Sequence, residues 1–215
     1  MRQGALSIEA LKSIGFDIET RLVIFVEDLF AKKWLEALRE LPDCAFEVIE
    51  VHFVMGDGNA LKMHKNHSLN PSVKIPSLCF LDGDSRHPAQ EVDQIYKLPG
   101  GHPEFTIFNS VVQRIEDNIA LLTAACQRPL NKQDEVRKMV ELVGKTNRDP
   151  HLLYSQIGIN IGQVSEEIVR GAFIAAWIDQ EPEAVALLME PIVKCLKLPL
   201  ITDEVVMNGS EMKNS

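Results

Sequence analysis

The chain has 215 residues, of which 46% are hydrophobic and 25% charged, ordinary values for a globular protein with enough apolar residues to form a core. Its 31 acidic residues outnumber 22 basic ones and give a net charge of -9, which argues against a constitutive nucleic-acid coat because duplex binding is driven largely by phosphate neutralisation. No apolar stretch approaches the roughly 18 to 20 residues that span a bilayer, and the first 20 residues carry acidic side chains and no secretory leader, so we expect a cytoplasmic protein without membrane contact.

Short apolar runs alternate with helical patterns in the first half of the chain. After a lead-in over residues 1–20, the run LVIFV at 22–26 is typical of a strand buried on both faces. Apolar residues then recur at helical spacing. The same reasoning predicts further strands over 46–55, 77–81 and 95–98, and helices over 30–41 and 59–69. This alternation predicts the α/β class, with a mostly parallel sheet flanked by helices.

The second half of the chain is predicted to be helical. The apolar pattern indicates one helix over 105–126, followed by helices over 131–145, 152–157, 164–178 and 184–196. We therefore expect four parts, which are a lead-in (1–20), an α/β core (21–128), a helical part packed on or inserted in the core (129–207), and a flexible tail (208–215).

Several distinctive residue types are interpreted as structural. Trp34 and Trp177 lie at apolar helical positions and are expected in the core. The Lys- and His-bearing helix over 59–69 is interpreted as a solvated face, with contact to phosphate as the alternative. The cysteines are far apart and lack the spacing of a zinc finger, so we expect reduced thiols at all four positions: Cys44, Cys79, Cys126 and Cys195.

Carboxylates follow two of the predicted strands. Glu27 ends the first strand, and Asp82 and Asp84 come directly after the third. Because parallel strands end at a common edge of the sheet, these three acids are expected to lie close together. A hard divalent cation would relieve their mutual repulsion with oxygen ligands alone. Alternatively, Asp82 starts an ordinary turn and Glu27 is a carboxylate at a helix start.

Three segments carry a resemblance to a known family. The strings VIFVEDLFAKKWL, SLCFLDGDS and KLPGGHPE together resemble the Toprim domain, most closely that of OLD-family endonucleases. The resemblance implies a Toprim-like sheet, Mg²⁺ or Mn²⁺ as cofactor, and Glu27, Asp82 and Asp84 as catalytic residues and metal ligands. Glu104, in the third string, would be a further metal ligand.

The sequence departs from the OLD pattern at two places. Ala31 stands where many members have a second acid, and Asp28 takes the usual glycine position. Either Asp28 compensates, or one metal is held firmly. OLD-type nucleases also use a lysine in the helical region. Here His151 is the candidate for this catalytic cation, and Lys145 is the other.

The resemblance implies a metal-dependent nuclease that hydrolyses phosphodiester bonds of DNA or RNA, within bacterial anti-phage defence. OLD-type enzymes join this domain to an ABC-type ATPase. The chain has no Walker motif, so we expect the ATPase as a separate partner subunit, with a missing N-terminal region as the alternative. A homo-oligomer is compatible with the sequence. Its two tyrosines, Tyr96 and Tyr154, lack a winged-helix context, which disfavours a topoisomerase.

Two alternative functions stay open. A catalytically degenerate Toprim domain could serve as an assembly module, and Ala31 favours this interpretation. A phosphatase of the haloacid-dehalogenase type would use Asp82 as nucleophile and Asp84 as acid. That fold carries its Asp-x-Asp on the first strand, whereas two strands are predicted to precede it here.

Overall fold

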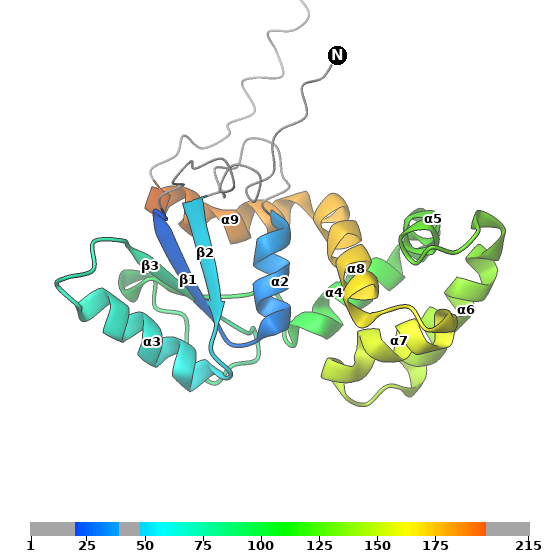
Figure 1. Cartoon of the computed structure of the whole chain (residues 1–215), viewed down its shortest axis with the longest axis horizontal. Coiled ribbons are helices and arrows are strands. Elements are labelled where there is room, and N and C mark those ends of the chain that lie inside the picture. Colours follow the sequence, from blue (N-terminus) through cyan, green and yellow to red (C-terminus); the bar gives the residue numbers. More distant parts are fainter. Residues whose placement is uncertain (1–19, 39–47, 197–215) are drawn as a thin grey trace, which may run out of the picture.

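The computed structural model describes residues 20–38 and 48–196. A sheet with its covering helices occupies one end of the long axis, and a group of helices occupies the other (Figure 1). The predicted lead-in before residue 20, the tail after residue 207, the helix end near Leu41 and Cys44 lie outside the described residues.

Four parallel strands form the sheet: β1 (Leu22–Val26), β2 (Ile49–Phe53), β3 (Ser77–Leu81) and β4 (Ile95–Lys97). Their order in the sheet is β2-β1-β3-β4. The predicted fold class, an α/β sheet flanked by helices with a helical C-terminal region, is confirmed. The interior strands β1 and β3 are buried at every position, as their continuous apolar runs predict, whereas the edge strand β2 is partly exposed.

Helices cover both faces of the sheet. Helix α2 (Leu29–Ala37) lies on one face, where it packs between the sheet and helix α8 (Glu166–Gln180). Trp34 and Trp177 are both buried there, with ring centroids 4.7 Å apart in an edge-to-face contact. The predicted core position of both tryptophans is confirmed, and their contact joins the helical region to the α/β core.

Helix α3 (Asp57–Leu69) covers the opposite face and differs from the sequence-based interpretation. His64 on this helix is only 2% exposed, so a fully solvated face is wrong. Its Nδ1 lies 2.9 Å from Ser77 Oγ and its Nε2 lies 2.8 Å from the carbonyl oxygen of Asp93. Burial lowers the His64 pKa, and both ring nitrogens serve to attach α3 to the sheet.

The single helix expected over 105–126 is wrong. The chain forms α4 (Pro103–Gln113) and α5 (Ile115–Ala125), with a break at Arg114. The Asn118 side chain donates to the carbonyls of Val111 and Arg114, so side-chain hydrogen bonds add to the backbone ones at the bend. The other helices match the expected order: α6 (Gln133–Thr146), α7 (Leu153–Gly162), α8 and α9 (Pro182–Leu196).

Two further sequence-based expectations concern cysteines and membranes. Cys79, Cys126 and Cys195 are free thiols, as expected. Among the described helices, none combines the length and apolar character needed to cross a bilayer.

The loop after β3 packs closely against the loop after β4. A Cβ atom added to Gly83 would lie 1.8 Å from the carbonyl oxygen of Gly100, which is backbone and cannot move aside cheaply. The Lys97 Nζ donates to the carbonyl oxygens of Gly83 and Ser85, at 3.1 and 2.7 Å. The Asp-Gly-Asp segment is therefore held in place by β4 and the residues that follow it.

We predict that Gly83→Ala lowers the free energy of unfolding by about 1–3 kcal/mol, because the methyl group forces the two loops apart. Gly58→Ala is the matched control, since nothing lies within 4 Å of a Cβ at that position in α3. It should leave stability unchanged or raise it by up to about 1 kcal/mol. Urea unfolding measures both, and equal stability of the two variants would contradict the close packing.

Candidate metal centre

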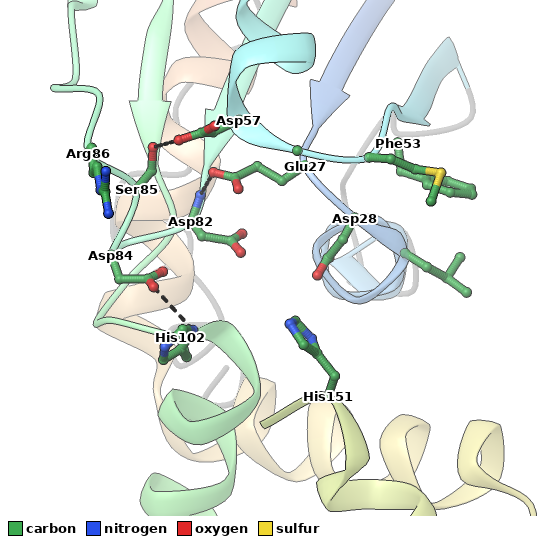
Figure 2. Close-up of a pocket in the computed structure, with 13 residues that line it drawn as sticks. Glu27, Asp28, Phe53, Asp57, Asp82, Asp84, Ser85, Arg86, His102 and His151 are labelled. Carbon is green, nitrogen blue, oxygen red and sulfur yellow. Dashed lines mark hydrogen bonds and ion pairs between the residues drawn. The ribbon is translucent and has the colours of Figure 1, made fainter. Parts of the chain in front are cut away.

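A cavity of about 720 Å³ opens at the carboxyl edge of the sheet. Residues from the loops after β1, β2 and β3 line it, together with His102 and His151 from the helical half of the chain. Figure 2 shows Asp28, Asp82 and His151 pointing toward its centre from three different segments. The edge that the parallel topology predicts for a ligand is therefore the edge that carries the cavity.

Glu27 and Asp82 meet in this cavity although 55 residues separate them in sequence. The backbone N–H of Asp82 donates to Glu27 Oε1 at 2.8 Å. Asp82 is only 9% exposed, and its Oδ1 has no hydrogen-bond partner within the described part of the chain. Buried carboxylate oxygens are normally paired, so this oxygen is available to a cation.

Asp84 lines the same cavity but pairs with another residue. Its Oδ2 lies 3.1 Å from His102 Nδ1, and its side chain is 41% exposed. Figure 2 shows this pair at the side of the cavity, away from Asp28. The structure thus brings Asp84 beside Glu27 and Asp82, with its carboxylate directed at an imidazole.

The loop that carries Asp82 and Asp84 is also fastened to helix α3. The Ser85 hydroxyl donates to Asp57 Oδ2 at 2.9 Å. This hydrogen bond, followed by smaller contributions, lowers the Asp57 pKa. Neither residue is part of the predicted site, because only the folded chain brings the start of α3 against the loop after β3.

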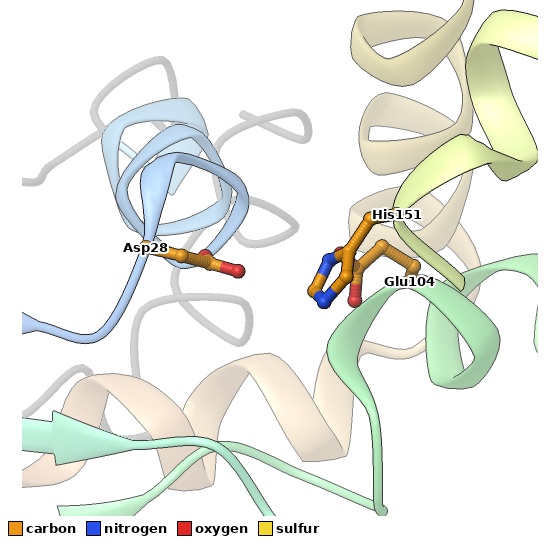
Figure 3. A group of neighbouring side chains, drawn as sticks. All are labelled: Asp28, Glu104 and His151. Carbon is orange, nitrogen blue, oxygen red and sulfur yellow. The ribbon is translucent and has the colours of Figure 1, made fainter. Parts of the chain in front are cut away.

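Asp28, Glu104 and His151 form a second constellation. One ligand atom from each residue lies within 4.8 Å of the others, so this group can hold a metal ion. Figure 3 shows the three side chains converging from α2, α4 and the turn before α7. Asp28 thus supplies an acid at this end of α2, whereas Ala31, where the OLD pattern has its second acid, is fully buried in the core.

Hydrogen bonds hold the backbone or side chain of each member of this group. Asp28 caps helix α2 by accepting the Ala31 N–H at 2.8 Å. The buried Tyr154 hydroxyl donates to the Glu104 carbonyl oxygen at 2.9 Å. The backbone N–H of His151 donates to Asp149 Oδ1 at 3.0 Å.

The two candidates for the catalytic cation lie in different places. His151 lines the cavity, and its Nδ1 is 2.8 Å from Glu104 Oε1. Partial burial lowers the His151 pKa, but the hydrogen bond and charge of Glu104 outweigh burial and raise it overall. Lys145 has a side chain that is 77% exposed, pairs weakly with Glu141 at 3.9 Å, and does not line the cavity.

Without a cation, burial and mutual repulsion disfavour the charged forms of the acids in the cavity. Burial is the main cause that raises the pKa of Glu27. Burial, followed by the charges of Glu27, Asp28, Glu104 and Asp84, raises the pKa of Asp82 to about 8. A divalent cation among these carboxylates would favour their charged forms.

Comparison with known proteins adds no family assignment. No protein-family model matches this sequence, and neither the curated proteins nor the solved structures searched gave a match.

We predict that the metal-free protein loses stability as pH rises from about 4 to about 8. Folded Asp82 keeps its proton up to about pH 8, whereas the unfolded chain releases it near 3.8. The folded state therefore binds more protons in this window, and its free energy of unfolding falls by up to about 1.4 kcal/mol per pH unit.

Urea unfolding in EDTA at several pH values measures this loss against Asp82→Asn, which cannot ionise. The difference in stability between wild type and Asp82→Asn should change with pH in the stated direction. Asp134→Asn, at a position on α6 where the side chain is 82% exposed, serves as the control and should follow wild type. Parallel pH profiles for wild type and Asp82→Asn would disprove the assignment.

Proposed function

We propose that this protein is a metal-dependent nuclease that hydrolyses phosphodiester bonds of DNA or RNA at the carboxyl edge of its sheet. The observation that carries the proposal is the hydrogen bond between Glu27 and Asp82 in a cavity where Asp82 keeps a buried oxygen without a partner among the described residues. Glu27, Asp82 and Asp84, the acids of the first two segments that resemble the Toprim domain of OLD-family endonucleases, line this same cavity.

The donor set fits a hard divalent cation, Mg²⁺ or Mn²⁺. Glu27, Asp82 and Asp84 offer carboxylate oxygens, the ligands that such ions prefer, and Asp82 Oδ1 lacks a donor within the described structure. When bound, the ion would supply Lewis-acid polarisation of the scissile phosphate and a bound water of lowered pKa.

Glu27 is suited to move a proton. Burial raises its pKa above the ordinary value of 4.5, which brings the carboxyl group closer to the range in which a side chain can both accept and return a proton near neutral pH. Its Oε1 already accepts the Asp82 N–H, so its orientation is fixed. We assign Glu27 the role of metal ligand or general acid/base.

His151 is suited to stabilise negative charge across the cavity. It reaches the cavity from the turn before α7, opposite the loops of the sheet (Figure 2). Its contact with Glu104 favours the charged imidazolium, which would stabilise charge on the phosphorane or the leaving oxygen. Lys145, exposed and outside the cavity, is not assigned this role.

The net charge of -9 supports control by a partner. An acidic protein attracts nucleic acid weakly, so docking of the substrate would use the surface of a separate subunit. An ABC/OLD-type ATPase in bacterial anti-phage defence is the partner that the resemblance favours.

One observation favours an alternative. Ala31 is fully buried and cannot ligate a metal, as expected for a degenerate Toprim domain that serves as an assembly module. Such a module has no need to bind Mg²⁺ or Mn²⁺, so calorimetry with both ions separates the two functions.

We predict that the wild-type protein cleaves plasmid DNA or tRNA in Mg²⁺ or Mn²⁺, and that Glu27→Gln and Asp82→Asn each reduce the rate at least about 100-fold. Both substitutions keep the size of the side chain and remove its charge. Gel assays over time measure the rates, after circular dichroism has verified that each variant is folded.

Asp134→Asn is the matched control, since its side chain is 82% exposed on α6 and lies outside the cavity. It should cleave at the wild-type rate. Cleavage by both cavity variants at the control's rate would refute the proposed site. A wild-type protein that binds neither ion and cuts neither substrate would favour the assembly module.

A further inference from the structure

We propose that Asp28, Glu104 and His151 form a second metal site, which binds a first-row transition-metal dication such as Mn²⁺ in preference to Mg²⁺ through the imidazole of His151. This inference deepens the proposed function and rests on the same cavity, but it concerns metal binding rather than cleavage. It makes His151 a metal ligand instead of a free cation.

The geometry is close to that of a bound ion. The three ligand atoms lie within 4.8 Å of one another. Ligand atoms bound to one ion at about 2.1 Å usually lie about 3.0 to 3.6 Å apart. Closure of the group therefore needs movements of about 1 to 2 Å at most, and the side chain of His151, which is 65% exposed, is free to make them.

Glu104 gives independent support for a cation at this site. It is only 3% exposed, and its Oε2 has no hydrogen-bond partner in the described part of the chain. A buried carboxylate oxygen without a partner costs free energy, which a cation offsets. Figure 3 shows the Glu104 carboxylate beside the His151 ring, with the Asp28 carboxylate directed toward them.

A simple ion pair between His151 and Glu104 leaves part of this arrangement unexplained. The 2.8 Å contact uses Glu104 Oε1 alone and satisfies neither Oε2 nor the Asp28 carboxylate. Asp28 uses its Oδ1 to cap α2, which directs its other oxygen away from that backbone contact. One dication bound by all three residues would neutralise both carboxylates.

The surroundings hold the three residues in place, as in known metal sites, where outer hydrogen bonds orient the ligands. Asp28 is fixed by the Ala31 N–H, Glu104 by the hydroxyl of Tyr154 on its carbonyl, and the His151 backbone by Asp149. The Asp28 side chain therefore loses little conformational entropy when the ion binds, whereas His151 keeps the side-chain freedom to close on the ion.

The ligand types determine the class of ion. Mg²⁺ is a hard ion that favours oxygen ligands and retains its waters, whereas imidazole nitrogen suits transition-metal dications. The Glu27, Asp82 and Asp84 group offers oxygen only. The two groups therefore differ in selectivity, with nitrogen ligation as the property that distinguishes the Asp28, Glu104 and His151 site.

Electron spin echo spectroscopy of the full chain loaded with Mn²⁺ tests this proposal, because a bound imidazole nitrogen modulates the echo. We expect ¹⁴N modulation in wild type and its loss in His151→Gln. The same substitution should weaken Mn²⁺ binding in calorimetry by about tenfold or more and change Mg²⁺ binding less than twofold. The exposed position of the His151 side chain makes a folded variant the expected outcome.

His102→Gln is the matched control, because His102 also lines the cavity but pairs with Asp84; it should keep the modulation. Modulation absent from wild type, retained in His151→Gln or lost in His102→Gln would overturn the second site. Glu104→Gln gives a second check, with an expected loss of Mn²⁺ affinity. Cleavage plays no part in these measurements, so a chain that shows the nitrogen signal but cuts no nucleic acid refutes the nuclease alone.

Discussion

The burial of carboxyl groups at the carboxyl edge of the sheet is the constraint on which the rest of this structure depends. Asp82 and Glu104 are each more than nine-tenths buried, and each keeps one oxygen without a partner among the described residues. Burial of such groups costs free energy unless a cation or donor offsets it. A cation in this cavity would offset that cost, and the imidazole of His151 already contacts Glu104.

The two halves of the chain must be fastened together for this cavity to exist. The α/β half supplies the strand ends, and the helical half supplies Glu104 and His151. Trp34 and Trp177 pack edge to face between α2 and α8, and the Tyr154 hydroxyl ties α7 to the first turn of α4. These contacts place carboxylates from one half within reach of an imidazole from the other.

Much of the fold was predictable because local patterns agree with tertiary burial. The fully apolar runs of β1 and β3 are interior strands in the structure, as periodicity indicates.

The pattern of apolar residues gave a wrong prediction at two places where polar side chains form hydrogen bonds inside the fold. The long helix breaks at Arg114, where the Asn118 side chain donates to the carbonyls of Val111 and Arg114. His64 is buried, and Ser77 and Asp93 satisfy its ring nitrogens. Neither hydrogen-bond partner can be read from the spacing of apolar residues.

The sequence by itself determined the class of the fold and the chemistry available at its edge, because strand-ending acids in a parallel sheet face a common side. Only the tertiary structure decided which of these acids meet. It joined Glu27 to Asp82, turned Asp84 toward His102, and gathered Asp28, Glu104 and His151 into one group. The physical reason is that these encounters depend on how helices pack on the sheet, and packing is set by contacts between residues far apart in the chain.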